Sequence, residues 1–150
     1  MSPELIRILI TAAILLHGVA HAKAFFALIA NAATSGDRAP VPVRSWLFPS
    51  LSPRAVALLA SPFWLLSTTG FVAASLSFWG ILAVAEMWRQ LAIGSSVISA
   101  LGIALFSGIW PGAPSRKFSA LDTAIALFMD AAILVLLLWA KWPPESMFGK

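Results

Sequence analysis

The sequence predicts an all-α integral membrane protein, an antiparallel four-helix bundle with one long proline-rich loop between helices one and two. Three observations predict this fold. Hydrophobic residues make up 60% of the 150 residues and charged residues only 11%, which leaves too few polar groups to cover a soluble monomer. The mean hydropathy is +0.91. Apolar runs of about 20 residues or more, the length that crosses a bilayer as a helix, follow one another along the chain.

The first predicted span covers residues 5–33. Its start resembles a secretory signal, because Arg7 precedes an apolar stretch that ends in small residues. The apolar pattern continues through Phe25 and Phe26, so we expect the segment to be retained as a helix. Residues 34–54 carry four prolines, which exclude a continuous helix and predict the long loop.

The stretch 55–110 is too long for one span and fits a helical hairpin. Its strongly charged break, Glu86 to Arg89, predicts the turn. The second and third spans are therefore expected at residues 55–82 and 90–110.

The fourth span is predicted at residues 122–141, with Ser119 or Asp122 as its N-terminal cap. The whole chain, residues 1–150, then forms a single four-span transmembrane domain. Lys and Arg are nearly balanced between the two sides, so the sequence leaves the direction of the topology open.

Each predicted span carries a polar group at a similar depth. Counted from the side of the long loop at about 1.5 Å per residue, these groups lie roughly 12 to 22 Å deep. Polar groups in a bilayer interior are costly and usually face the protein interior. We name the six candidate ligand-binding residues the polar layer: His17, His21, Thr68, Ser95, Ser99 and Asp130.

His17 and His21, the two histidines of the chain, lie one helical turn apart and share a face. Three roles are open: hydrogen bonds between helices, a proton or small-molecule site, and binding of a metal or pigment. For the first role, the pair His21 and Asp130 is favoured, because a deep carboxylate needs a partner or a proton. Two histidines and one aspartate fall short of the four ligands of a closed metal site, so the sequence assigns no metal and leaves any cofactor open.

Other features of the sequence narrow the function classes. The chain has no cysteine, which excludes thiolate chemistry and disulfides. It carries no phosphate-binding glycine loop and no nucleophile elbow, so no catalytic residue is assigned and an enzyme is disfavoured. The net charge of +4 comes without a basic run, which indicates lipid contacts rather than nucleic acid. Five tryptophans near predicted span ends, Trp110 among them, are expected to form interfacial belts.

The first span and the start of the last resemble a family of small bacterial four-helix membrane proteins of uncharacterised function in the DoxX-like group. The elements that match are His17-Gly18-Val19-Ala20-His21, followed by Phe25-Phe26, and the stretch from Arg116 to Asp122. The resemblance implies a four-helix bundle in the bacterial inner membrane and an association with quinone-linked redox complexes. Ala22-Lys23-Ala24 departs from the apolar stretch ending in glycine that is more common there.

Two functions are therefore expected. The first is an accessory or scaffold subunit of a membrane complex, with a protein partner or a second copy of the chain; the resemblance implies that this complex is redox-associated. The alternative is a membrane-embedded binding protein or enzyme for a lipophilic small molecule, such as a quinone, isoprenoid, sterol-like lipid or pigment. In that case His17, His21 and Asp130 would contact the molecule.

Overall fold

The computed structural model describes residues 2–33, 43–82, 84–106 and 110–144, and within these ranges the protein is all-helical, without strands. The all-α prediction is therefore confirmed. A short 3-10 helix precedes the third long helix, and a π-helical segment extends the fourth. The elements in order are α1 (Pro3–Ala33), α2 (Pro53–Phe78), η1 (Ala85–Met87), α3 (Trp88–Leu105), α4 (Arg116–Leu134) and η2 (Val135–Trp139).

The helices α1, α2 and α3, and α4 together with η2, are each long and apolar enough to cross a membrane. Large apolar side chains are exposed on all of them: Leu16, Leu66, Leu101 and Phe128 have exposed fractions of 68%, 53%, 50% and 70%. Such a surface is costly in water and suits hydrocarbon. The chain is therefore an integral membrane protein.

Several helix ends differ from the predicted ones, including the end of α2 at Phe78 instead of residue 82. α4 begins at Arg116, well before the predicted residue 122, because the Ser115 hydroxyl accepts a hydrogen bond from the backbone N–H of Phe118. The prediction that Ser119 or Asp122 caps this helix is wrong. α3 ends at Leu105 instead of residue 110.

The predicted proline-rich loop is only partly described. Its first part, residues 34–42, lies outside the described residues. The second part, residues 43–52, contains no helix. Ser52 then caps α2 by accepting a hydrogen bond from the N–H of Ala55, and Pro53 occupies the first turn, where no backbone donor is needed.

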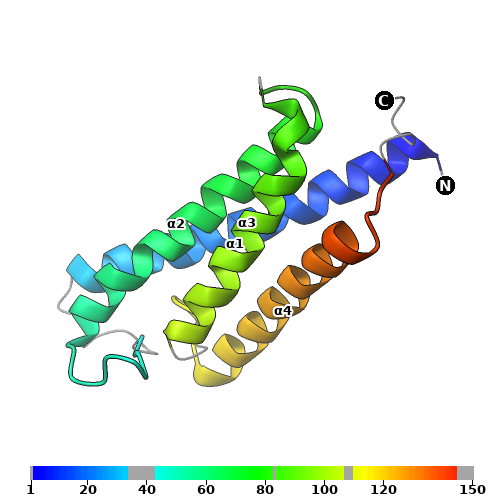
Figure 1. Cartoon of the computed structure of the whole chain (residues 1–150). Helices are drawn as coiled ribbons and strands as arrows, with labels where there is room; N and C mark the ends of the chain where they lie inside the picture. Colours follow the sequence, from blue (N-terminus) through cyan, green and yellow to red (C-terminus); the bar gives the residue numbers. More distant parts are fainter. Residues whose placement is uncertain (1, 34–42, 83, 107–109, 145–150) are drawn as a thin grey trace.

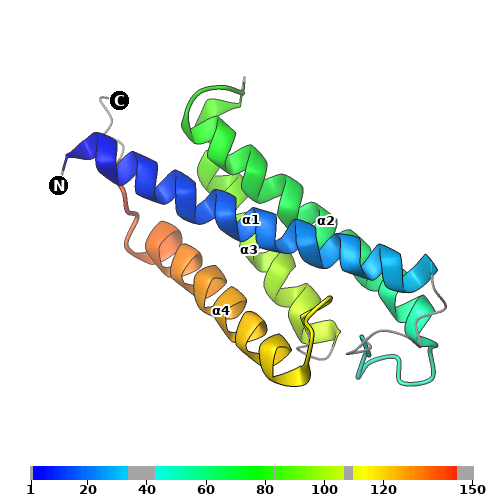
Figure 2. The same ribbon diagram turned by 180° about the vertical axis from the view of Figure 1, so that it is seen from behind.

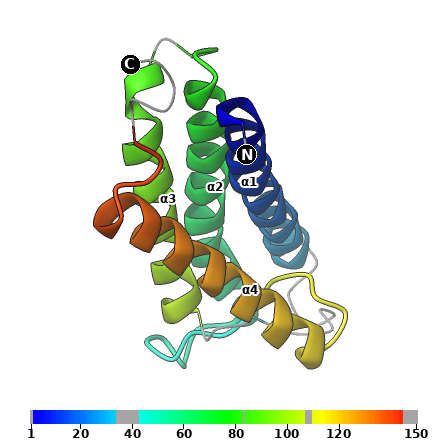
Figure 3. The same ribbon diagram turned by 90° about the vertical axis from the view of Figure 1, so that its right-hand side faces the viewer.

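Small residues set the spacing of the helices. α1 packs along α2, and α2 along α3 (Figures 1 and 3). A Cβ added at Gly18 would lie 3.0 Å from the Cβ of Phe71, and one added at Gly70 would lie 2.0 Å from the hydroxyl of Ser95. Glycine is therefore needed at both crossings, next to the polar layer. α4 lies against α3 and crosses obliquely over it (Figure 3).

Two apolar clusters form the core, one on each side of the polar layer. The loop-side cluster lies toward residues 43–52, and the terminal-side cluster toward the start of α1. The loop-side cluster includes Ala24, Leu28, Val56, Ala60, Trp64, Ile103 and Phe106. The terminal-side cluster comprises Ile14, Phe71, Ala74, Phe78, Trp88, Ala92, Ile133 and Leu137.

Candidate functional site

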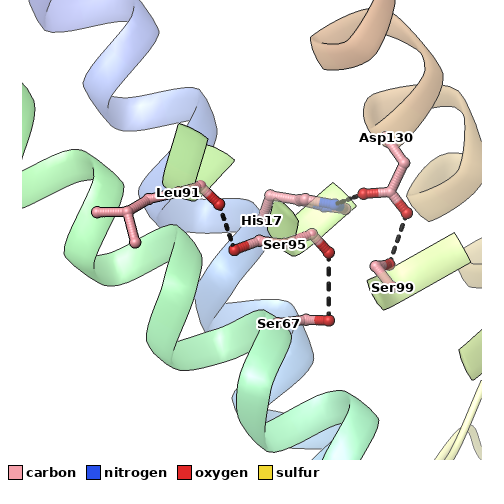
Figure 4. Close-up of polar contacts among 6 residues, drawn as sticks. All are labelled: His17, Ser67, Leu91, Ser95, Ser99 and Asp130. Carbon is pink, nitrogen blue, oxygen red and sulfur yellow. Dashed lines mark hydrogen bonds and ion pairs between the residues drawn. The ribbon is translucent and has the colours of Figure 1, made fainter. Parts of the chain in front are cut away.

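Asp130 of α4 is the centre of the polar layer. Nε2 of His17 lies 2.9 Å from Oδ1 of Asp130, close enough for the two atoms to share a hydrogen. The hydroxyl of Ser99 donates to Oδ2 at 2.5 Å. Figure 4 shows this chain of contacts, which joins α1, α3 and α4 through one carboxyl group. Asp130 is only 1% exposed, so these two partners replace the water that a carboxyl group otherwise requires.

His21 does not pair with Asp130, and the pairing favoured from the sequence is therefore wrong. The way α4 is rotated and tilted relative to α1 brings His17, one turn before His21, to the carboxyl group of Asp130. Neither ring nitrogen of His21 has a hydrogen-bond partner among the described residues, although the side chain is 1% exposed. Its ring lies between those of Phe71 and Trp110, with centroids 5.6 and 5.1 Å away.

The hydroxyls of the polar layer divide into three kinds. Ser99 contacts Asp130, as described. The hydroxyl of Ser95 donates to the carbonyl of Leu91 on its own helix at 2.7 Å, and the backbone carbonyl of Ser95 accepts from Ser67 of α2 at 3.4 Å (Figure 4). The hydroxyl of Thr68 is buried without a partner among the described residues. The structure thus brings His17, His21, Ser99 and Asp130 together, whereas Ser95 serves helix packing.

Trp110 belongs to the site, although the sequence predicted it at the membrane interface. It was expected in an interfacial belt, but it is 5% exposed and stacks on His21 with an interplanar angle of 30°. Ser119 holds it there by accepting from its backbone N–H at 2.7 Å. Its neighbours Pro111 and Gly112 signalled only the end of a helix, so no sequence signal pointed inward.

Two cavities lie where α1 faces α4. One, of about 140 Å³, is lined in part by polar and charged side chains; the other, of about 110 Å³, is lined almost entirely by apolar ones. The polar cavity is lined by His17, Ala20, Lys23, Trp110, Asp122 and Ile125, among others. The lining of the apolar cavity includes Ile10, Ala13, Ile14, Met129, Ile133 and Leu137. Lys23 and Asp122 were not predicted as site residues. They line the same cavity only because α1 and α4 face each other, and the sequence does not show which helices face each other.

The fold and the site together define an all-helical membrane protein with a His–His–Asp cluster in its interior. The chain matches no family model, no curated protein and no solved structure. Its resemblance to the DoxX-like group therefore stays a prediction.

Proposed function

We propose that this protein is a membrane-embedded binding protein for a lipophilic small molecule that has a polar head and an apolar tail. One observation carries the proposal: the His17–Asp130 pair lies between a polar and an apolar cavity, and α1 and α4 line both cavities. Along α1, Ile14 of the apolar cavity precedes His17 and Ala20 of the polar cavity follows it.

The chemistry of the two cavities matches the two ends of such a molecule. His17 lines the polar cavity, and Lys23 and Asp122 supply one formal charge of each sign. A cavity of about 150 Å³ accommodates a benzene ring, so the polar cavity, of about 140 Å³, has the size of one unsubstituted six-membered ring. The apolar cavity offers an isoprenoid or acyl tail a path past Met129 and Leu137.

The setting we propose is an antiparallel four-helix bundle in the bacterial inner membrane. The bond from Arg7, near the start of α1, to the backbone carbonyl of Phe78, at the end of α2, supports opposite directions for these two helices. The bacterial membrane rests on the resemblance described above. The accessory-subunit interpretation also stays a prediction, because no described contact favours a protein partner over lipid.

The test is to identify what co-purifies with the protein. Wild type is isolated from bacterial membranes in mild detergent, and its organic extract is compared by mass spectrometry with that of Ala20→Trp, which fills the polar cavity. Val19→Trp is the matched control, because Val19 is exposed like its neighbour Ala20 but lines neither cavity. We expect one lipophilic species in wild type and in the control that is strongly depleted in Ala20→Trp. Equal amounts in all three proteins would contradict the proposal.

A further inference from the structure

We propose that His17, His21 and Asp130 together bind one divalent first-row transition-metal ion. Each of the three side chains offers one ligand atom, and these atoms lie within 4.8 Å of one another in the interior of the protein. All three side chains are buried, with exposed fractions of 6%, 1% and 1%. The inference does not rest on the proposed lipid site, since it needs only the three ligand atoms, although His17 also lines the polar cavity.

Two of the three ligand atoms already have the spacing that one ion requires, whereas the His21 nitrogen, within 4.8 Å of the others, must move closer. Two ligands about 2.1 Å from a metal, at tetrahedral or octahedral angles, lie about 3.0 to 3.4 Å apart. Nε2 of His17 and Oδ1 of Asp130 lie 2.9 Å apart. The His21 ring makes no hydrogen bond that would resist a small rotation toward them.

His21 is the observation that points to a ligand. A buried polar group without a partner is rare and costly, and His21 has two such nitrogens. Trp64, Thr68, Ser77 and Ser96 also bury a polar atom without a partner among the described residues, but His21 lies within 4.8 Å of two further ligand atoms. A metal bound to one His21 nitrogen would give that nitrogen the partner that no described protein group supplies, and the other nitrogen would remain without one.

The donor set indicates the class of metal. Two imidazoles and one carboxylate, without a thiolate, are typical of zinc and iron(II) sites in which three protein ligands leave a position open. Magnesium and calcium prefer oxygen ligands throughout. The carboxylate also lowers the net charge that the ion brings into the membrane interior, and Ser99 fixes its second oxygen.

The experiment measures metal uptake directly. The protein is purified in mild detergent through an affinity tag that lacks histidine, stripped with a chelator and titrated with Co²⁺, followed by its visible spectrum and by elemental analysis. The variants are His21→Leu and Asp130→Asn. Ser75→Ala is the matched control, because Ser75 is equally buried but bonds to the Phe71 carbonyl, outside the cluster.

We expect wild type and Ser75→Ala to take up about one Co²⁺ per chain with a ligand-field band, and the two variants to bind about 100-fold more weakly. Wild type that takes up no Co²⁺, or variants that bind as wild type does, would overturn the inference. If a variant does not fold, the ring ¹⁵N NMR signals of His17 and His21 in wild type are recorded with and without Zn²⁺. The inference requires that the signals of both rings change, and unchanged signals of either ring would overturn it. A variant that loses Co²⁺ uptake but keeps the lipophilic species shows that the metal site and the lipid site are separate. So does a variant that keeps Co²⁺ uptake but loses the lipophilic species.

Discussion

The ring of Trp110 stacks on that of His21, with centroids 5.1 Å apart, and thereby closes the loop side of the polar layer. Trp110, which precedes α4, thus reaches into the interior of the protein. Ser119 fixes this arrangement, since its hydroxyl accepts from the N–H of Trp110 and donates to its carbonyl.

Trp110→Ala should therefore destabilise the protein strongly. Truncating a buried tryptophan leaves a cavity and costs about 3 to 5 kcal/mol of unfolding free energy. Trp139→Ala is the matched control, because Trp139 is 85% exposed, and it should cost less than about 1 kcal/mol. Denaturant unfolding in detergent measures both. Similar losses for the two variants would show that Trp110 does not pack in the interior.

His17 and Asp130 should be energetically coupled. His17→Leu leaves Asp130 buried with Ser99 as its remaining partner, and loss of one member of a buried pair costs about 3 kcal/mol. Asp130→Leu should cost a similar amount. The double variant should cost less than the two losses combined, by about 1 kcal/mol, in line with coupling between polar groups in membrane helices.

The unfolding free energies of these single and double variants are measured in the presence of a chelator, so that metal binding does not contribute to them. Thr69→Ala combined with His17→Leu serves as a control pair, because the Thr69 hydroxyl bonds only to carbonyls of its own helix. That pair should be additive. Additivity for His17 and Asp130 as well would argue against the contact.

The crossing of α2 and α3 should not tolerate a methyl group at Gly70. An added Cβ would lie 2.0 Å from the hydroxyl oxygen of Ser95 but 3.3 Å from its Cβ. Gly70→Ala should therefore cost about 1 to 3 kcal/mol, and adding Ser95→Ala should recover most of this loss. Gly94→Ala is the control: nothing lies within 4 Å of its added Cβ, so helix propensity should stabilise it by up to about 1 kcal/mol. If Gly70→Ala is as stable as Gly94→Ala, the helices are further apart than described.

Four membrane-crossing helices make a definite prediction for side-specific labelling. The chain has no cysteine, so single-cysteine variants give clean signals. Leu51→Cys and Ser115→Cys should react with an impermeant thiol reagent from one side of the membrane. Ser2→Cys and Gly80→Cys should react from the other side. If Leu51→Cys and Gly80→Cys react from the same side, α2 does not cross the membrane.

Much of the fold could be predicted from the sequence because lipid imposes a simple rule: long apolar runs become helices. The end of the first span at Ala33 and the turn near Glu86 follow from that rule and agree with the structure. The start of α4 was missed because a single serine hydroxyl decides it, and Ser115, Ser119 and Asp122 all suit a cap.

The site was predictable in depth but not in pairing. Rise per residue places His17, His21 and Asp130 at similar levels, and the structure brings all three together. Which histidine meets the carboxyl group depends on the rotation and tilt of α4 relative to α1, and sequence periodicity contains neither. The inward position of Trp110 depends on a loop conformation and was missed for the same reason.

The placement of the polar layer between two apolar clusters fixes the register of the helices. Apolar helix faces slide past one another with little change in contact chemistry. A slip of α4 by one turn, about 5.4 Å, would carry Asp130 away from both His17 and Ser99 and into one of the clusters. One carboxyl group thus selects a single alignment among several that hydrophobic packing alone would accept.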